Sequence, residues 1–306
     1  MIGSIAKYFR NESKPKIIIW HPTKYDFGLG DRLRGFAGGI AYAEIVGAKL
    51  IVSAPPSQAC PVEFNELFEK VENFSIAPKP IDIDIYTKND EYEIIAEWDQ
   101  KVNMTPMRHY EYLQNKHPFR VSPKKFKKKW KSVLKKLRPN SDIRSELEHL
   151  KSKMHSKALG VHLRRTDVMT CDSKLITSKN VDRFDETLWD KITELLSSKS
   201  YRQVFLASDD KDYFENWKQH LLNQGVEVLH YNQNWSASEF RQTSLDGVVI
   251  DMYMMASCDQ VVGSIPSSLF IIGRGLGGTY RIIKPPEMIR NSHKRKPRRT
   301  FLGIPV

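Results

Sequence analysis

The sequence predicts an α/β protein with two doubly wound, Rossmann-like domains. Short apolar runs alternate with amphipathic helical stretches through most of the chain, which indicates parallel strands with helices on both faces of a sheet. The length of 306 residues is enough for two domains that each bury a core of their own. An apolar content of 40% is ordinary for a globular protein, so a disordered chain is excluded.

The first half opens with a strand, a loop, a helix and a strand, the unit that begins a doubly wound domain. We expect the strands at residues 16–20 (KIIIW) and 50–52, and the helix from 32 to about 46. A glycine-rich turn at 27–31 (FGLGD) connects the first strand to the helix. Residues 60–120 are less regular and indicate mixed helix and loop.

The stretch 124–138 (KKFKKKWKSVLKKLR) predicts a basic amphipathic helix. Its apolar residues recur along one side, namely Phe126, Trp130, Val133, Leu134 and Leu137. We expect that side to be core and the lysines to be solvated. Contact of the basic side with an anionic membrane surface is the alternative. Asn140 and Ser141 break the pattern before another helix at 142–154.

The second half continues the alternation of strands and helices. Strands are expected at 158–163, 203–207, 227–229 and 260–263, and helices at 185–197, 210–222, 247–256 and from about Ser267. The predicted domains are 1–145 and 146–290, followed by a basic tail at 291–306.

Composition limits the cellular compartment and the class of binding partner. No apolar window approaches ~18 residues and the amino terminus lacks an apolar signal-peptide core, so neither a membrane span nor a leader is expected. Cys60, Cys171 and Cys258 are too few and scattered for a disulfide framework or a cysteine-based metal site, which favours the cytoplasm. The net charge of +12 implies a polyanionic partner. No zinc-finger spacing or RNA-binding motif appears, so no nucleic acid is expected.

The most informative stretch is GVHLRRTD at 160–167, where Arg164, Arg165 and Asp167 follow a buried strand. Ligands of open α/β sheets bind outside the carboxyl ends of the strands. Adjacent guanidiniums at that place suit a diphosphate, because each offers a planar fork of donors to phosphate oxygens. A salt-bridged strand end is the alternative.

Acids and hydroxyls follow in the same half of the chain. The strand at 205–208 runs into Asp209 and Asp210, which point to different sides because side chains alternate along a strand. We expect Asp210 to cap the next helix. Asp209 is expected to hold Arg165 or to line the pocket for the base of a bound nucleotide. Asp251 interrupts an apolar helix, and a serine-rich turn, SIPSS, occupies 264–268.

As an ordered set, these motifs resemble the GDP-fucose-dependent fucosyltransferases of the α-(1,6) and α-(1,2) types. The H-x-R-R-x-D string at 162–167 is similar to their donor-binding motif. The α-(1,6) enzymes have the same succession of Arg-Arg motif, strand ending in two acids, helix with a buried Asp, and serine-rich turn. The resemblance covers 158–275, with a looser match before it. It implies a GT-B fold, in which two Rossmann-like domains face a central cleft.

The resemblance also implies roles for individual residues. Arg164 is expected to clamp the leaving diphosphate in place of the metal ion that many sugar transferases use. Asp251 is expected to accept hydrogen bonds from the two donors on the guanine edge. The other donor-binding candidates are His162, Arg165, Asp209, Ser264, Ser267 and Ser268. No metal ligands are expected, and no cofactor besides the donor substrate GDP-fucose.

Inverting transfer needs a base beside the acceptor hydroxyl. Asp172 stands five residues after Asp167, where the α-(1,6) family has a proposed catalytic carboxylate, there a Glu. Asp167 is the rival. The catalytic candidates are therefore Arg164, Asp167 and Asp172.

The glycine-rich turn near the amino terminus is a second candidate site. Related fucosyltransferases have a similar turn that faces the cleft between the domains. Gly28 and Gly30 are expected to let the backbone approach the ligand, while Asp31 or Arg32 reaches toward it. A tight strand-to-helix turn without a ligand is the alternative.

These expectations combine into one function. The sequence predicts an inverting, metal-independent fucosyltransferase that moves L-fucose from GDP-fucose to a glycan hydroxyl, with the α-(1,6) linkage favoured over α-(1,2). The alternatives are a transferase for another GDP- or UDP-sugar on the same fold, and a non-catalytic protein that binds nucleotides or polyanions. We expect a cytoplasmic protein, with a peripheral place at a membrane surface left open.

Overall fold

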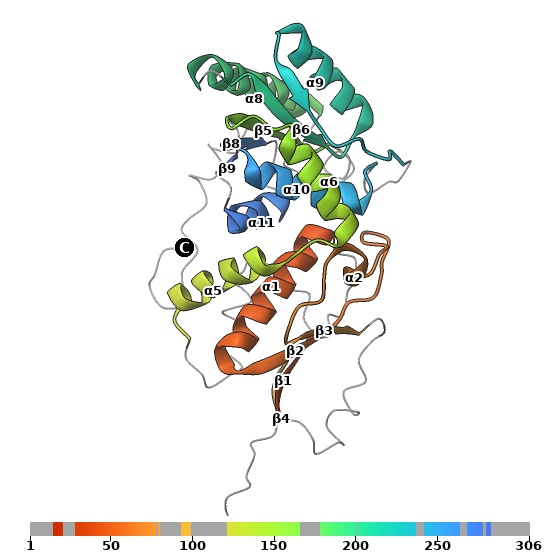
Figure 1. The fold of residues 1–306 in the computed structure, drawn as a ribbon, viewed down its shortest axis with the longest axis vertical. Helices are drawn as coiled ribbons and strands as arrows, with labels where there is room; N and C mark the ends of the chain where they lie inside the picture. The colour runs from red at the N-terminus through yellow and green to blue at the C-terminus, as the bar shows by residue number, and fades with distance from the viewer. Residues whose placement is uncertain are drawn as a thin grey trace, which may run out of the picture. The chain divides into compact units, whose positions relative to one another are not determined.

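The computed structural model describes residues 15–20, 28–77, 79, 93–98, 121–165, 178–199, 201–236, 242–263, 268–277 and 280–282. The chain divides into two compact units, Met1–Asn140 and Ser141–Val306, which are described separately. Both are α/β units with parallel sheets, so the predicted fold class is confirmed (Figure 1).

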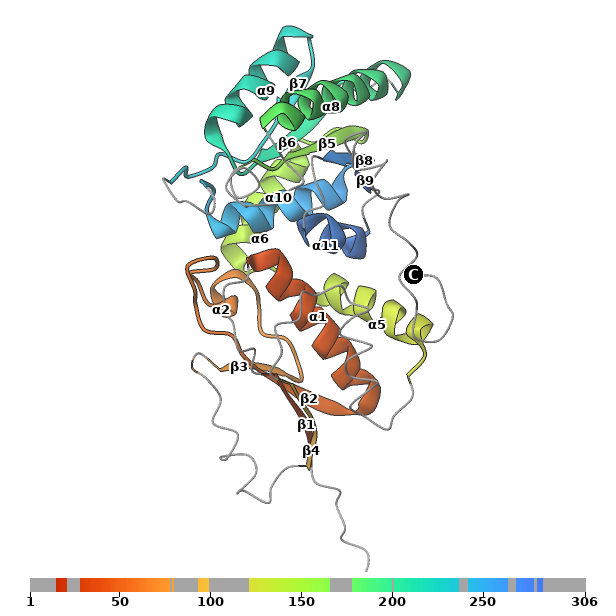
Figure 2. The ribbon, with the colours of Figure 1, turned by 180° about the vertical axis from the view of Figure 1, so that it is seen from behind.

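The first unit contains a four-stranded parallel sheet in the order β3-β2-β1-β4. Its elements are β1 (Lys16–Trp20), α1 (Leu29–Val46), β2 (Ala48–Ser53), α2 (Phe64–Leu67), β3 (Phe74–Ala77), β4 (Glu93–Trp98) and α5 (Pro123–Lys136). Helix α1 packs on β2 and on α5. Gly39 allows this close approach, because a Cβ there would lie 2.6 Å from the Leu50 side chain. Figure 2 shows α1 and α5 side by side, as Figure 1 does.

The second unit contains a five-stranded parallel sheet in the order β7-β6-β5-β8-β9. Its strands are β5 (Ala158–Leu163), β6 (Gln203–Ser208), β7 (Glu227–Leu229), β8 (Gln260–Gly263) and β9 (Tyr280–Ile282). Its helices are α6 (Ser141–Ser152), α8 (Ser178–Lys199), α9 (Lys211–Asn223), α10 (Leu245–Ser257) and α11 (Ser268–Leu276). Helices α8 and α9 lie on one side of the sheet, and α6, α10 and α11 lie on the other (Figures 1 and 2).

Both faces of the second sheet are therefore covered, which explains its continuous apolar strands. The α8 and α9 side holds a core cluster in which Leu159, Val161 and Leu163 of β5 pack with residues such as Leu188 and Trp217. The strand order reverses between β5 and β8, because the chain first adds β6 and β7 on one side and then β8 and β9 on the other. This reversal decides where a ligand can bind.

The predictions from local periodicity missed three strands and placed the starts of two helices too late in the chain. Strands β3 and β4 lie in a stretch predicted as mixed helix and loop, and β9 was not predicted. These strands have neighbours far away in the chain, and that pairing leaves little trace in a short segment. Helix α1 begins at Leu29 rather than 32, because the Gly28 carbonyl already accepts from the N–H groups of Asp31 and Arg32. Helix α8 begins at Ser178, before the predicted 185, in a polar stretch without apolar periodicity.

Candidate functional site

The carboxyl ends of β5, β6 and β8 meet at one edge of the second sheet, since all three strands are parallel. The strand order reverses between β5 and β8, the place where open α/β sheets bind ligands. Arg164 and Arg165 directly follow β5, and Asp209 directly follows β6. The fold thus brings the Arg-Arg motif and Asp209 together at the predicted edge.

Arg165 is held by three contacts within the unit. Its backbone N–H donates to Asp209 Oδ1 at 2.6 Å. Its guanidinium Nη1 lies 3.1 Å from Asp185 Oδ2 on α8, and its Cζ lies 4.5 Å from the ring centre of Tyr213 on α9. Arg165 therefore ties the end of β5 to both helices on that side. Arg165 thus forms the salt-bridged strand end considered as the alternative, and its place among the donor-binding residues stays a prediction.

Asp185 is the common partner in this network, which the sequence analysis did not identify. It accepts a hydrogen bond from the Tyr213 hydroxyl as well as from Arg165. Burial, together with the bond to Asp185, raises the pKa of Tyr213 far above its ordinary value, so the phenol stays a neutral donor. Asp210 accepts from the backbone N–H of Tyr213 at 2.8 Å, which confirms it as the cap of α9.

His162 is buried, with 5% of its surface exposed, in the middle strand of the sheet. Its register neighbours are Ala207 of β6 and Gly263 of β8, two of the smallest side chains available. Because side chains alternate along β5, His162 lies on the opposite face from Val161 and Leu163, which belong to the apolar cluster beneath α8 and α9. It therefore faces the side of the sheet that α10 covers.

Asp251 lies on α10 and is 5% exposed. Its Oδ2 accepts a hydrogen bond from Gln233 Nε2 at 3.0 Å. Burial raises the pKa of Asp251 well above its ordinary value, and the bond from Gln233 lowers it in part. The carboxyl group is therefore held in a place where its charged form is costly, the usual mark of a group with a functional task.

Gln233 is a site residue that sequence reasoning missed. Its position depends on Gly247, because a Cβ at that residue would lie 2.0 Å from Gln233 Oε1. Gly247 and Asp251 are four residues apart on one face of α10, so the glycine that admits Gln233 stands one turn before the acid it binds. A glycine inside an apolar helix, one turn before an acid, is the signal that could have found this contact.

The residues of the second candidate site lie at the start of α1 in the first unit. Gly28 is the N-cap of α1, and Gly30 and Asp31 belong to its first turn. Asp31 Oδ1 pairs with Arg34 Nη2 at 3.1 Å. The buried Arg32 donates to the carbonyls of Ala54 and Pro55, at 3.2 and 3.0 Å, and to Ser57 Oγ at 2.9 Å. Arg32 thus fastens α1 to the loop after β2, and its predicted role toward a ligand stays a prediction.

Other predicted residues lie outside the described part of the chain. They are Asp167, Asp172, Ser264 and Ser267, while Ser268 begins α11 with a side chain that is not described. Within the described ranges, no group of three or more His, Cys, Asp and Glu side chains could hold a metal ion. No helix among the described residues is long and apolar enough to cross a membrane.

The brace made by Arg165 can be tested by a conservative change. Arg165→Lys keeps the charge but loses the planar fork that serves Asp185 and Tyr213. We expect the free energy of unfolding in urea to fall by about 1–2 kcal/mol. Arg202→Lys, at an exposed arginine of the same unit, is the matched control and should change it by less than about 0.5 kcal/mol. Equal losses in the two variants would contradict a brace at Arg165.

The buried acid predicts a pH dependence of stability. In the unfolded chain Asp251 ionises near 3.8, while the folded protein retains the proton to higher pH. Unfolding therefore releases a proton in the interval between the two pKa values, so this residue lowers stability as the pH rises. We expect Asp251→Asn to unfold at a higher temperature than the wild type at neutral pH. The difference should vanish in acid below 3.8, where the aspartate is protonated in both states. A variant less stable at neutral pH would show that the folded protein favours the carboxylate.

The segment of the chain that carries the candidate site matches a known protein family. Residues 131–272 match a model of the α-(1,6)-fucosyltransferase N- and catalytic domains. No curated protein matches the chain significantly in sequence. The match contains the end of β5, the end of β6 and helix α10, which are the elements that carry the candidate site.

Solved fucosyltransferase structures have a similar fold. NodZ from Bradyrhizobium is 18% identical with a TM-score of 0.52, over 90% of this chain and 96% of NodZ. POFUT1 is 14% identical with a TM-score of 0.51, over 90% of this chain and 99% of POFUT1. Arabidopsis thaliana FUT1 is 14% identical with a TM-score of 0.52, over 92% of this chain and 73% of FUT1. The match over 131–272 and the likeness in fold confirm the predicted resemblance to the GDP-fucose-dependent fucosyltransferase superfamily.

Proposed function

We propose that this protein transfers L-fucose from GDP-fucose to a glycan hydroxyl, with inversion at the anomeric carbon and without a metal ion. The match of residues 131–272 to an α-(1,6)-fucosyltransferase catalytic domain carries the proposal. It is supported by the similar structures of NodZ soaked with GDP-fucose and of POFUT1 in complex with GDP-fucose. The α-(1,6) description of the family model favours that linkage over α-(1,2).

Arg164 is the proposed clamp on the diphosphate. Arg165 is committed to Asp185 on the α8 side, and side chains of an extended chain alternate. The alternation of β5, continued past its end, puts Arg164 on the side of His162. A guanidinium there can donate to phosphate oxygens and offset the charge that builds up as GDP leaves. A charged donor at such a position lowers a barrier by about 2.7–4 kcal/mol, or about 10²–10³ in rate.

One hydroxyl-bearing segment, residues 264–268, would complete the phosphate site. Helix α11 begins at Ser268, the first described residue after β8 ends at Gly263. A helix N-terminus presents free backbone N–H groups and the positive end of its dipole to an anion. We assign Ser264, Ser267 and Ser268 to the phosphates on this ground, with Asp209 holding the backbone of Arg165 beside them.

Asp251 is the proposed reader of the guanine base. The N1–H and the exocyclic amine of guanine are adjacent donors, and a carboxylate accepts from both, whereas the Watson–Crick edge of uracil offers one donor between two carbonyls. Burial raises the pKa of this carboxyl group and so disfavours the carboxylate, whereas two hydrogen bonds from guanine favour it. Affinity for GDP should therefore be coupled to proton release.

The remaining assignments follow the family resemblance. Asp172 is the proposed base that takes the proton of the acceptor hydroxyl, with Asp167 as the rival. The donor domain is assigned to 146–290, the acceptor side to 1–145 and the basic tail to 291–306. The proposed cleft-loop residues are Gly28, Gly30, Asp31 and Arg32, of which Arg32 also bonds the loop after β2.

Calorimetric titration with GDP, GDP-fucose and UDP in the presence of EDTA tests the donor. We expect GDP and GDP-fucose to bind in EDTA and UDP to remain silent. The affinity for GDP should fall as the pH is lowered, since burial raises the pKa of Asp251 and protonation removes the proposed acceptor. Equal binding of UDP would favour another nucleotide sugar, and loss of GDP binding in EDTA would contradict a metal-free site.

Substitution of the proposed clamp tests catalysis. We expect Arg164→Ala to lower kcat for fucose transfer by about 10²–10³ or more, with an unchanged circular dichroism spectrum. Arg202→Ala removes the same charge from an exposed position of the same unit and should leave transfer unchanged. Near-normal transfer by the Arg164 variant would refute the proposed mechanism. GDP binding without transfer in the wild type would leave a nucleotide-binding protein.

A further inference from the structure

Helix α5 carries a row of lysines that neither the fold nor the proposed function uses. Its sequence, PKKFKKKWKSVLKK, has lysine at every polar position except Ser132 and contains no acid. Lys124, Lys128, Lys131 and Lys135 are spaced by four, three and four residues and so share one face of the helix. We call these four residues the lysine row, and all four are exposed.

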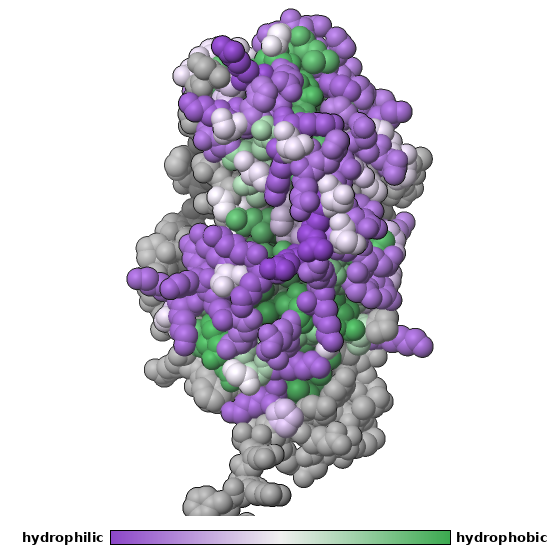
Figure 3. All heavy atoms as spheres, viewed as in Figure 1, coloured by the Kyte–Doolittle hydropathy of each residue, from purple (hydrophilic) through white to green (hydrophobic). Residues whose placement is uncertain are grey.

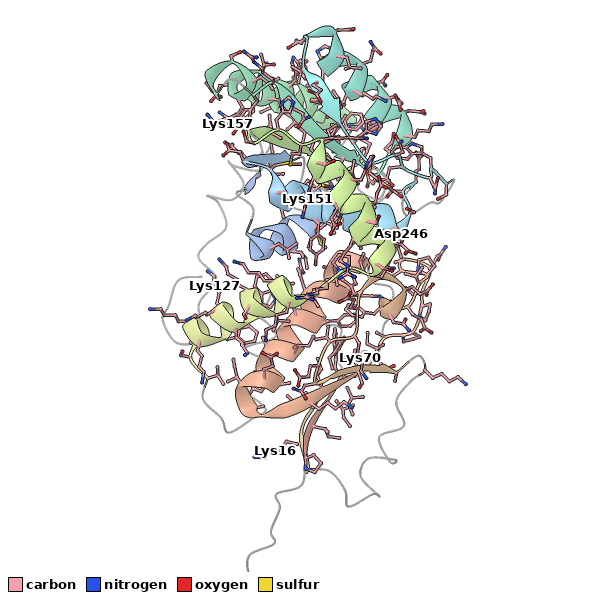
Figure 4. The ribbon with its side chains drawn as sticks, in the orientation of Figure 1. Lys16, Lys70, Lys127, Lys151, Lys157 and Asp246 are labelled. Atoms are coloured by element: carbon pink, nitrogen blue, oxygen red, sulfur yellow. The ribbon has the colours of Figure 1, made fainter. Side chains whose placement is uncertain are left out.

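The lysine row lies opposite the buried side of α5. Phe126, Trp130, Val133 and Leu134 are buried, and α5 packs against α1. At 3.6 residues per turn the row falls on the far side of the helix from these four. Figure 4 labels Lys127, which neighbours the row and points away from the first unit, and Figure 3 shows hydrophilic residues over this helix.

Among the described residues, lysines on one flank of α5 are paired with an acid, whereas those of the lysine row are not. Glu44 of α1 pairs with Lys129 at 2.5 Å and with Lys136 at 3.7 Å. Within the part of the chain that the structure describes, no ion pair involves Lys124, Lys128, Lys131 or Lys135. The row is therefore a strip of uncompensated positive charge along one helix.

Local stability does not explain the row. Like charges three and four residues apart repel each other on a helix, and lysines in the first turn oppose the helix dipole. Helix α5 has no acid in its first turn to compensate. Burial of the apolar side against α1 holds the helix in spite of this repulsion. Residues that destabilise their own helix are expected where the surface they form has a function.

The side-chain chemistry of the lysine row indicates the kind of partner that it fits. All its charges are lysines, which act as point charges, whereas arginine is preferred for bidentate recognition of phosphate and nucleic acid. The row holds no aromatic side chain on which a base could stack. The apolar side of α5 is already buried in the unit, so the helix has nothing to insert into hydrocarbon. A layer of diffuse negative charge is the surface that these properties fit.

We propose that the lysine row of α5 binds an anionic lipid surface by electrostatic attraction alone, without insertion of the helix. Clusters of four to eight basic residues on an amphipathic helix are typical of such binding. The proposal is independent of the donor and the reaction. It gives the excess positive charge of this chain a specific location.

Vesicle sedimentation tests the proposal on the full chain. We expect binding to vesicles of phosphatidylcholine with phosphatidylserine, and none to phosphatidylcholine alone. About 1 M salt should release the protein, because the Debye length then falls to about 3 Å. Replacement of all four row lysines by Gln should weaken binding to the anionic vesicles by about 100-fold or more, from about fivefold for each lysine.

A matched variant separates the row from net charge. Lys70, Lys151, Lys157 and Lys211 are exposed and scattered over both units, and the first three are labelled in Figure 4. Their replacement by Gln removes the same charge and should weaken binding by less than about tenfold. Equal losses in the two variants would overturn the proposal. Binding of duplex DNA that is tighter than vesicle binding, and that disappears with the row, would replace it by nucleic acid binding.

Folding of the variants is checked by thermal unfolding. Since the row lysines repel one another, their replacement should leave Tm unchanged or raise it. A lower Tm than in the scattered control would overturn the argument that the row is not a stability device. The smaller variant Lys128→Gln/Lys131→Gln, expected to lose about 25-fold, then decides whether vesicle binding follows the row.

Discussion

The two-residue alternation at the end of β5 is the constraint on which the candidate site depends. It sends Arg165 toward α8 and α9, where Asp185 and Tyr213 hold it, and so leaves Arg164 for the opposite side with His162. We therefore propose different tasks for the two neighbouring arginines: Arg165 braces the strand end, and Arg164 contacts the ligand. A register shift of one residue would exchange them. The pairing of β5 between β6 and β8 is what prevents that shift.

Asp251 is a buried carboxyl group whose proposed role is recognition of guanine. A carboxyl group in the interior is costly when charged, and burial accordingly raises its pKa. Gln233 contributes one hydrogen bond, and the missing side chain of Gly247 creates the space for it. The arrangement is poor for stability but suits a base that brings two donors of its own. The contact between α10 and the segment after β7 is thus part of the proposed guanine site.

Helix α5 has a buried apolar face and an exposed basic face, because apolar residues recur with the helical period of 3.6. The apolar face joins α1 in the core of the first unit, and Glu44 compensates the charges beside it. The outward face is free to collect lysines at a cost that the buried face outweighs. One helix can therefore stabilise its unit and carry an interaction surface, because residues on opposite faces do not compete for the same neighbours.

Much of the fold and part of the site could be predicted from the sequence, because they depend on local patterns. Short apolar runs marked β5 and β8, the 3.6-residue period marked the buried side of α5, and Asp210 stood where a helix cap belongs. The tertiary structure alone decided the rest. Strands β3 and β4 exist through pairing with β2 and β1, Arg32 binds a loop more than twenty residues away, and Gln233 reaches Asp251 only because the chain folds back over α10. Periodicity and capping act within a few residues, whereas the partner of a polar side chain is chosen by long-range packing that no single segment encodes.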